Sequence, residues 1–535
     1  MKGSPTLNRS SATCNLQLVT SRNNNQRMLH MIKTFYSLLA VLLLSFSIQH
    51  AGTWQSKYVK QEKNGTLTYT ADANGNIIPD FSRVGYHGGD EDIPIIPVVK
   101  TISPANDGSS ENIVQSAINE ISKLSLGKNG FRGSILLKKG TYKIPGQIKI
   151  SASGIVLRGE GDDTKLIAAG PGQRALISVS GSGNAKPFES SRIKITDAYV
   201  PVGSYSFNVA SANGFRKGDQ VIVHRSANDQ WIKDLKMDQI EERPGTKQWQ
   251  AKEYNISFER VITKIEGNKI FIDQPIVMAL EEKYGGGELV KYEFKGRINR
   301  VGIENLYCES EYANDTAENH SWDAVNFEKI ENGWVRNVSS KYFGYSCVNL
   351  EYNAKYISVL DCHSLDMKSQ ITGGRRYSFN NTGQMNLFMD CSANEGRHDY
   401  VTGARVRGPN VFYNCTATNT HADIGPHHRW AMGTLYDNIV TDGEINVQDR
   451  GNWGSGHGWS GVTQVLWNCK VKNATVQNPW VNGNNYAIGV QGIKAAGRLK
   501  GRPDGLWEGQ NEPGLEPQSL YMSQLHTRKR TPPAP

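Results

Sequence analysis

The chain has 535 residues, 38% of them apolar and 54 of them glycine, and its formal net charge is +9 at pH 7. This length is sufficient for two or three average domains, or for one long repetitive domain with a large core. The composition favours a turn-rich β-protein over a helical one, and no block of lysine and arginine dominates, which argues against a nucleic-acid-binding arm. A basic groove for an acidic ligand fits the charge better.

The first predicted element is a secretory signal peptide at residues 31–51, "MIKTFYSLLAVLLLSFSIQHA". A positive start precedes an apolar core that is too short for a comfortable transmembrane helix, and cleavage is expected near Ala51. The alternative is an uncleaved signal anchor. Residues 1–51 are therefore assigned to an N-terminal extension and signal, and the mature protein is expected to be secreted or periplasmic.

Residues 52–170 are predicted to contain one helix and the first strands. The stretch "SSENIVQSAINEISKL" (109–124) begins with residue types that cap helices. Its apolar residues recur at helical spacing, at Ile113, Ala117, Ile118 and Ile121. The stretch 133–167 then holds three short strands separated by glycine turns.

Two motifs in this region resemble a known superfamily. The stretches "GTYKI" (140–144) and "GIVLRGEG" (154–161) are similar to the first coils of secreted right-handed parallel β-helix enzymes of the pectate lyase superfamily. The resemblance implies an all-β chain folded as a right-handed single-stranded parallel β-helix. It leaves the activity open, because the superfamily contains lyases, hydrolases and non-enzymatic tailspikes.

Residues 171–295 break the pattern and are predicted to form irregular coils with an inserted β subdomain. Two hairpins are expected, at 214–225 and at 260–276, the second with a Gly-Asn turn. The segment between them, 228–249, is expected to be a loop that lines one wall of a groove.

A repeat marks residues 296–494, the predicted main coils with the groove. A short apolar run followed by Asp or Asn, then Cys, recurs around Cys308, Cys362, Cys391, Cys415 and Cys469. The spacing from Cys415 to Cys469 is about twice the spacing between the cysteines before it and is counted as two equal coils, and Val338 takes the cysteine's place one coil before Cys362. Such periods, with β-branched runs and Asn-rich turns, indicate a parallel β-helix.

We expect these cysteines to form an inward-facing ladder of free thiols, because aligned residues of adjacent coils point the same way. Isolated disulfide pairs are the alternative in a secreted chain. The helix at 109–124 is expected to cap the open end of the solenoid and so cover its edge strands. Residues 495–535, rich in Gly, Pro and charge, are expected to lie as a tail on the solenoid surface.

The cysteine spacings also stack the polar residues of successive coils. Alignment of Cys391 with Cys415 predicts the neighbours Arg397 and His421, Asp399 and Asp423, and Arg405 and Arg429. Alignment of Cys362 with Cys391 adds the neighbours Arg376 and Arg405, and Lys368 and Arg397. Two arginines about 5 Å apart repel by roughly 1 kcal/mol in water, so an aligned row indicates a groove for polyanions. The alternative is a solvated face with its charges splayed apart.

We therefore expect an acidic polysaccharide as the partner and β-elimination as the reaction. A lyase must neutralise a uronate carboxylate, take the proton α to it and protonate the leaving oxygen. The predicted catalytic residues are His398, Tyr400, His427, His428, Arg429 and Arg405. The predicted substrate-binding residues are Arg376, Arg397, His421, Arg407, Arg450, Lys368, Asn452, Trp453 and His457.

Calcium is the one cofactor kept open, with stacked Asp399 and Asp423 as its ligands. A transition-metal site at the histidines of the stretch 421–433, "HADIGPHHRWAMG", is disfavoured, because adjacent His427 and His428 would point in opposite directions in a strand.

Two other functions remain alternatives to a lyase. A β-helix glycoside hydrolase would use Asp399, Asp423 and Asp449, although the surrounding cations lower the pKa of a general acid. A non-catalytic glycan-binding β-helix would need only the fold and the basic stripe. In each case we expect a monomer with no nucleic-acid partner and, after signal removal, no membrane contact; the sugar and the endo or exo mode are not determined by the sequence.

Overall fold

The computed structural model describes residues 52–106 and 108–530. The predicted signal peptide at 31–51 and Cys14 lie outside these residues. The described residues from Thr53 to Arg530 form one compact unit. Within the described residues, no helix is both long enough and apolar enough to cross a membrane.

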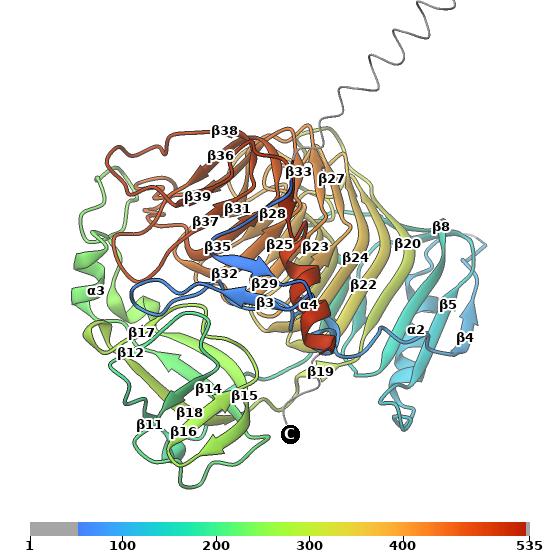
Figure 1. Ribbon diagram of the computed structural model, residues 1–535. Helices are drawn as coiled ribbons and strands as arrows, with labels where there is room; N and C mark the ends of the chain where they lie inside the picture. Colours follow the sequence, from blue (N-terminus) through green and yellow to red (C-terminus); the bar gives the residue numbers. More distant parts are fainter. Residues whose placement is uncertain (1–51, 107, 531–535) are drawn as a thin grey trace, which may run out of the picture. The chain divides into compact units, whose positions relative to one another are not determined.

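Most of this unit is wound into a parallel β-helix, which confirms the predicted fold class (Figure 1). One parallel sheet of 27 strands, counted over the described residues, follows the solenoid from coil to coil. Each coil contributes strands to three faces, which we call A, B and C in chain order. The long strands of the early coils bend at a corner and so belong to both A and B.

The strands of face A are β4 (Val98–Ile102), β5 (Gly133–Leu137), the first parts of β8 (Ile155–Ala168), β20 (Gly302–Ser310), β22 (Ile330–Lys341) and β24 (Ala354–Leu365), then β26 (Leu387–Met389), β29 (Arg407–Tyr413), β32 (Ala431–Asp437), β35 (Gly461–Trp467), β37 (Tyr486–Ile488) and β39 (Leu506–Glu508). Face B continues β8, β20, β22 and β24 and adds β6 (Gly140–Ile144), β27 (Ser392–Asn394), β30 (Thr416–Thr418), β33 (Val440–Thr441), β36 (Lys470–Val476) and β38 (Gln491–Lys494).

Face C contains β7 (Ile148–Ile150), β9 (Ala175–Ser180), β21 (Asp323–Glu328), β23 (Ser346–Leu350), β25 (Phe379–Asn381), β28 (Tyr400–Thr402), β31 (Asp423–Pro426), β34 (Glu444–Val447) and the end of β36. The short strand β19 (Ile298–Asn299) pairs with the start of β22.

The corner between faces A and B explains the repeated Asp/Asn-Cys context. The residue before the ladder position has a φ of 50–57° in seven consecutive coils, at Asn305, Asn337, Asp361, Asp390, Asn414, Asn438 and Asn468. Among non-glycine residues, Asn and Asp tolerate this left-handed conformation best. Neighbouring corners are also hydrogen-bonded, since Asn468 Nδ2 donates to Asn438 Oδ1 at 2.8 Å.

The residue after each corner points into the core, as predicted. Strand pairing aligns Leu306, Val338, Cys362, Cys391, Cys415, Ile439 and Cys469. The six cysteines of the described residues are all buried and free. Two details of the prediction are wrong: Cys308 lies beyond the ladder position, which Leu306 occupies, and Ile439 divides the interval from Cys415 to Cys469 into a shorter and a longer coil rather than two equal ones.

Helix α2 (Glu111–Ser122) packs against β4–β8, the first coils, as the predicted cap. Its buried face consists of Val114, Ala117, Ile118 and Ile121. The predicted core residue Ile113 is 40% exposed, and Val114 takes its place.

The two terminal segments of the described chain lie together on the outside of face A. Strand β1 (Trp54–Gln55) pairs with β40 (Leu515–Glu516), next to the hairpin of β2 (Val59–Gln61) and β3 (Leu67–Tyr69), the 3₁₀ turn η1 (Tyr86–Gly89) and helix α4 (Leu520–Arg530). Their apolar residues form one cluster with outward-facing residues of face A, among them Val411, Leu435 and Trp467.

An antiparallel subdomain is inserted between β9 and β19 (green in Figure 1). Its main sheet consists of β10 (Lys186–Pro187), β11 (Ile193–Lys194), β13 (Ser206–Asn208), β14 (Gln220–Arg225), β15 (Ile256–Glu266), β16 (Lys269–Ile272) and β18 (Gly287–Glu293). It also contains the pair β12 (Tyr199–Val200) and β17 (Leu280–Glu281), helix α3 (Asp229–Asp234) and the 3₁₀ turns η2 (Glu189–Ser191), η3 (Ala251–Tyr254) and η4 (Glu282–Tyr284).

The hairpin of β15 and β16, with its turn at Gly267 and Asn268, is confirmed. The hairpin predicted at 214–225 is wrong, because that stretch contributes the single strand β14, which pairs with β15 and β18. The segment predicted as a loop at 228–249 contains α3.

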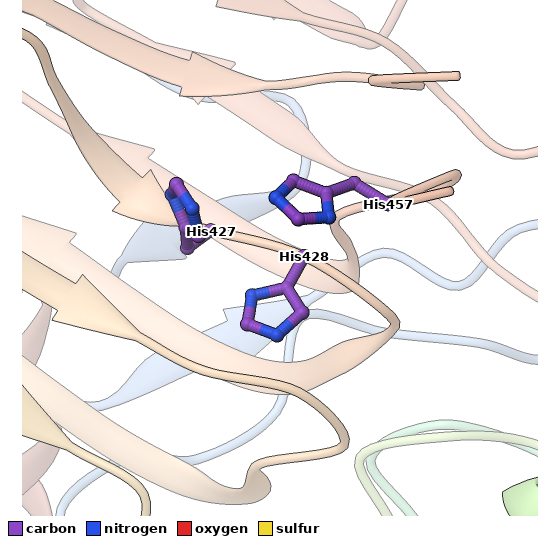
Figure 2. A group of neighbouring side chains, drawn as sticks. All are labelled: His427, His428 and His457. Carbon is purple, nitrogen blue, oxygen red and sulfur yellow. The ribbon is translucent and has the colours of Figure 1, made fainter. Parts of the chain in front are cut away.

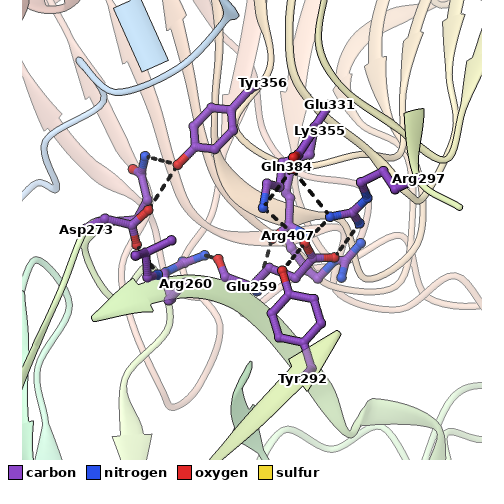
Figure 3. A network of polar contacts seen from close by, with 12 residues as sticks. Glu259, Arg260, Asp273, Tyr292, Arg297, Glu331, Lys355, Tyr356, Gln384 and Arg407 are labelled. Atoms are coloured by element: carbon purple, nitrogen blue, oxygen red, sulfur yellow. Dashed lines mark hydrogen bonds and ion pairs between the residues drawn. The ribbon is translucent and has the colours of Figure 1, made fainter. Parts of the chain in front are cut away.

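A buried polar network joins this subdomain to the β-helix (Figure 3). Glu259 on β15 accepts bonds from Arg297 Nη1 at 2.6 Å and Nη2 at 2.7 Å, and from Tyr292 at 2.8 Å. Lys355 on β24 lies 3.2 Å from the same carboxylate. Burial alone would raise the pKa of Glu259, but the Lys355 and Arg297 cations hold it well below its usual value. The carboxylate is therefore ionised and fixes the inserted sheet against face A.

Candidate active site

A cavity of about 630 Å³ lies along face C of the β-helix. It spans successive coils, from the residues before β25 to the loop after β34. It is lined by Gly373, Gly374, Tyr377, Arg397, His398, Ala422, Asp423, His427, His428, Arg450, Trp453, Gly454 and His457. Polar residues of several coils therefore converge at this one place, and Asp423, His427 and His428 of the stretch 421–433 are among them.

The floor of the cavity is a chain of three polar side chains, His398, Asp423 and Arg450. His398 Nδ1 lies 2.6 Å from the backbone oxygen of Asp423, and the Asp423 carboxylate is bonded to the Arg450 guanidinium. A carbonyl oxygen only accepts hydrogen bonds, so Nδ1 carries the proton of the neutral imidazole and Nε2 keeps its lone pair. Nε2 is buried and has no hydrogen-bond partner among the described residues.

The charges of the floor are determined by burial and by the neighbouring ions. Burial lowers the pKa of His398 to about 4, against the opposing effect of Asp423. Burial would raise the pKa of Asp423, but Arg450 and His398 lower it below its usual value. The floor therefore presents a neutral imidazole beside an ion pair.

Three further histidines of the cavity lining, His427, His428 and His457, lie close together (Figure 2). The ring centroids of His428 and His457 are 4.8 Å apart, and His427 lies 5.1 Å from His457. Burial lowers the pKa of all three, and neighbouring histidines and arginines lower it further, to about 3 for His428 and about 4 for His457. These imidazoles are therefore neutral near pH 7.

The backbone explains why His427 and His428 face the same space. Strand β31 ends at Pro426, so neither histidine lies in the strand, and the opposite directions expected of neighbours in a strand do not apply to them. Arg429 and Trp430 then have left-handed φ values of 52° and 68°, which turn the chain away.

His457 reaches the cavity from the loop that follows β34, and the inserted subdomain holds this loop. Trp249 Nε1 donates to the Gly456 oxygen at 3.2 Å, and Arg243 Nη2 donates to the Gly454 oxygen at 2.8 Å. The segment 228–249 thus supports the cavity loop, but none of its residues lines the cavity.

The rim of the cavity contains Tyr377, Arg397 and Trp453. The Tyr377 ring lies edge-on to His398, with centroids 5.0 Å apart. Burial raises the pKa of Tyr377, and the Arg397 cation opposes this effect, so the phenol is protonated at neutral pH. Trp453 is 36% exposed, and the guanidinium groups of Arg450 and Arg498 lie over its ring. Tyr377 was not predicted as a site residue from the sequence, because it follows the irregular loop 366–376, where the coil repeat gives no register.

The structure places Tyr400 in the core rather than in the cavity. Its ring stacks on Phe379, and its hydroxyl donates to the backbone oxygens of Cys391 at 2.9 Å and Thr416 at 2.6 Å. Trp430 is also buried, where it packs against Trp231 of the inserted subdomain.

Several predicted substrate-binding residues are bound to other protein groups, away from the cavity. Arg376 donates to the Ser369 oxygen at 2.7 Å, and Arg407 to the Tyr352 oxygen at 2.6 Å. The others pair elsewhere in the same way: Lys368 with Asp315 and Asp366, His421 with Glu395, and Asn452 with Glu241 and Arg498.

The predicted arginine row is shorter than expected. Arg405 N donates to the Arg429 oxygen at 2.8 Å, which confirms the register predicted from Cys391 and Cys415. Neither residue lines the cavity: Arg429 bonds Ser455 at 2.7 Å, and Arg405 lies over the Tyr254 ring. Arg376 does not extend the row, because face C follows a different register at this coil and Arg376 lies beside Arg397 instead.

The three predicted aspartates do not form a common site. Asp399 is fully buried and bonded to Ser378 Oγ at 2.7 Å, and burial raises its pKa to about 7. Asp449 is bonded to Arg502 at 2.7 Å. Among the described residues that line the cavity, only Asp423 therefore carries a carboxylate, and this carboxylate forms an ion pair with Arg450. This geometry fits neither a calcium site at Asp399 and Asp423 nor a pair of catalytic carboxylates.

Comparisons with known proteins indicate what the chain is similar to. No family model matches it, and no curated protein matches it. Among solved structures it is similar to the tailspike protein gp49 from Pseudomonas phage LKA1, with 14% identity over 68% of this chain and 68% of that chain and a TM-score of 0.34.

Two enzymes are similar at the same level. An alginate lyase from Paenibacillus sp. str. FPU-7 has 11% identity over 77% of this chain and 100% of that chain, with a TM-score of 0.35. The catalytic domain of a GH87 α-1,3-glucanase has 12% identity over 79% of this chain and 67% of that chain, with a TM-score of 0.35. Likenesses this weak assign no activity; the class that the strand topology defines is a parallel β-helix protein.

Proposed function

We propose that this protein is a secreted polysaccharide lyase that cleaves a uronic-acid-containing polysaccharide by β-elimination. The observation that carries the proposal is His398, whose Nδ1 is bonded to a carbonyl and whose Nε2 is therefore an unprotonated base, next to Tyr377 and Arg397 in the cavity. Export rests on the signal expected at residues 31–51.

Three cavity residues have a role in this reaction. Arg397 binds the uronate carboxylate and stabilises the enolate-like charge that develops on it. His398 Nε2 takes the proton from the carbon α to that carboxylate, and the bond between the neighbouring carbon and the glycosidic oxygen breaks. Tyr377 gives its proton to the leaving oxygen, and a carbon–carbon double bond remains in the new sugar end.

Hydrolysis by two carboxylic acids is a poorer fit. That mechanism needs a pair of carboxyl groups about 5–10 Å apart, one of them protonated. Among the described residues lining the cavity, only Asp423 carries a carboxyl group, and its ion pair with Arg450 keeps it ionised.

The test is a panel of acidic polysaccharides, with products followed by the ultraviolet absorbance of the unsaturated uronate end. We expect absorbing products from at least one polymer, and a loss of at least about 100-fold in turnover for His398→Ala. The control is His421→Ala, which changes a partly exposed histidine paired with Glu395 outside the cavity. New reducing ends without absorbance would identify a hydrolase, and binding without products would identify a glycan-binding protein; either result overturns the proposal.

A further inference from the structure

We propose that His427, His428 and His457 form a binding site for one divalent transition-metal ion, with an anion as the fourth ligand. This inference goes beyond the proposed function and does not depend on it. It uses none of the residues assigned to proton transfer or to carboxylate binding.

The geometry of the three imidazoles is close to that of a metal site. One nitrogen from each ring can be chosen so that all three lie within 4.8 Å of one another. Zinc binds imidazole nitrogen at about 2.0–2.1 Å, so tetrahedral neighbours lie about 3.4 Å apart. Small side-chain rotations bridge the difference, since the rings already converge on one space (Figure 2). No other cluster of metal-ligating side chains was found among the described residues.

Each of the three rings has a nitrogen that no other protein group uses. Nδ1 of His427, of His428 and of His457 is buried in each case, and none has a hydrogen-bond partner among the described residues. Buried polar atoms without partners are rare because they keep their desolvation cost, so three in one cluster require an explanation. A metal ion that binds all three side chains supplies one.

The backbone holds the two ligand segments together. Arg429 N donates to the His457 oxygen at 3.1 Å, and His427 N donates to the Thr402 oxygen on the previous coil at 2.8 Å. Glycine at position 454 leaves room for the third ligand, because a Cβ there would overlap the His457 ring. The cluster is therefore preorganised by the fold and not by contacts between the rings alone.

The surrounding charges select the fourth ligand. Three imidazole ligands leave both charges of a metal ion uncompensated, and the nearby arginines Arg405, Arg429 and Arg450 add positive charge, with only Arg450 paired to a carboxylate. A hydroxide ion or the carboxylate of a bound ligand balances this charge, and the cavity of about 630 Å³ has room for either. Imidazole donors favour zinc, copper, nickel and iron over calcium or magnesium.

The test is metal binding by the full chain without any substrate, after chelator treatment and with any affinity tag removed. We expect Zn²⁺ to bind with a stoichiometry of one by calorimetry, and Co²⁺ at the same site to give a visible absorption spectrum of a tetrahedral or five-coordinate ion. His428→Ala and His457→Ala should each weaken binding by more than about 100-fold, since they remove direct ligands. Gly454→Ala should also weaken binding, because it displaces His457.

The matched control is His421→Ala, which should bind Zn²⁺ as the parent does. Melting temperatures establish that each variant is folded. Absence of saturable Zn²⁺ and Co²⁺ binding in the parent, or unchanged binding in His428→Ala and His457→Ala, overturns the inference. Because no polysaccharide is present, this failure is distinct from failure of the lyase assay, and either proposal can stand alone.

Discussion

Lys355 Nζ lies 3.2 Å from Glu259 Oε2, and both side chains are almost fully buried. The pair joins strand β24 of the β-helix to strand β15 of the inserted subdomain, and Arg297 binds the same carboxylate. A buried ion that loses its partner keeps its desolvation cost, so this joint depends on the charge of Glu259.

Glu259→Gln is therefore expected to destabilise the protein by up to about 3–5 kcal/mol, because it leaves two buried cations with only the partly exposed Glu331 carboxylate as a counterion. The free energy of unfolding in urea measures this effect. Lys355→Met should cost less, since Glu259 then remains paired with Arg297. The control Glu282→Gln, at an exposed ion pair with Lys194 in the same subdomain, should have little effect. Equal effects of the Glu259 and Glu282 changes would contradict the prediction.

Substitution of Tyr377 is expected to affect activity, and substitution of Tyr400 is expected to affect stability. Tyr377→Phe should lower turnover by about 10²–10⁴-fold at an unchanged melting temperature, because it removes the proton donor for the leaving oxygen. Tyr400→Phe should keep most activity but lose about 1 kcal/mol of stability, because it removes a hydroxyl that bonds two backbone oxygens in the core. The reverse pattern would return the catalytic role to Tyr400.

The stability of the protein is expected to depend on pH because of the buried carboxyl group of Asp437. It is fully buried beneath the C-terminal segment, where it accepts bonds from Ser519 Oγ and Tyr521 N, both at 2.8 Å. Burial raises its pKa from 3.8 to about 7. Between these values the folded protein binds more protons than the unfolded chain, so stability falls as pH rises from about 4 to 7, by up to about 1.4 kcal/mol per pH unit.

The comparison with Asp437→Asn isolates this contribution. The free energy of unfolding of the variant relative to the parent should increase with pH across the same window and stay constant above about pH 7. Urea titrations at several pH values measure the slope. If the difference in unfolding free energy between variant and parent does not change with pH, the Asp437 carboxyl has the same pKa in the folded and unfolded states, which contradicts the prediction.

The six described cysteines are expected to be unreactive in the folded protein. They are buried and free, and burial raises the pKa of the Cys347 and Cys469 thiols to about 12. All six are shielded from solvent, so iodoacetamide should label them only after unfolding. Mass spectrometry of native and denatured samples makes the comparison, and native disulfides among Cys362, Cys391, Cys415 and Cys469 would contradict the ladder.

The fold could be predicted because its signal is local and repeated. Each of these corners needs a residue that tolerates a left-handed conformation, and the next residue must fill the core, so Asn or Asp followed by Cys or another apolar residue recurs in seven consecutive coils. The same register correctly placed Asp399 beside Asp423 and Arg405 beside Arg429, since no insertion lies between these coils.

The site was predictable only in part, because its residues lie where the repeat is broken. The register that aligns Cys362 with Cys391 holds on faces A and B. On face C the offset between the same coils is smaller, because the loop 366–376 adds its residues before β25, and Phe379 pairs with Tyr400. Arg376 and Lys368 were misplaced for this reason, and Tyr377 was missed. Tyr400 was misassigned because the inward position of a short strand has no periodic signature of its own.

The left-handed corners also have a consequence for how such a chain can change during evolution. The coils that begin at Asn305, Asn337, Asp361 and Asn438 differ in length, yet each returns to the same corner with the core position aligned. Residues can therefore be gained or lost in the loops that border the cavity without moving its floor. Insertions at the rim can therefore change the shape of the cavity while His398, Asp423 and Arg450 keep their places in its floor.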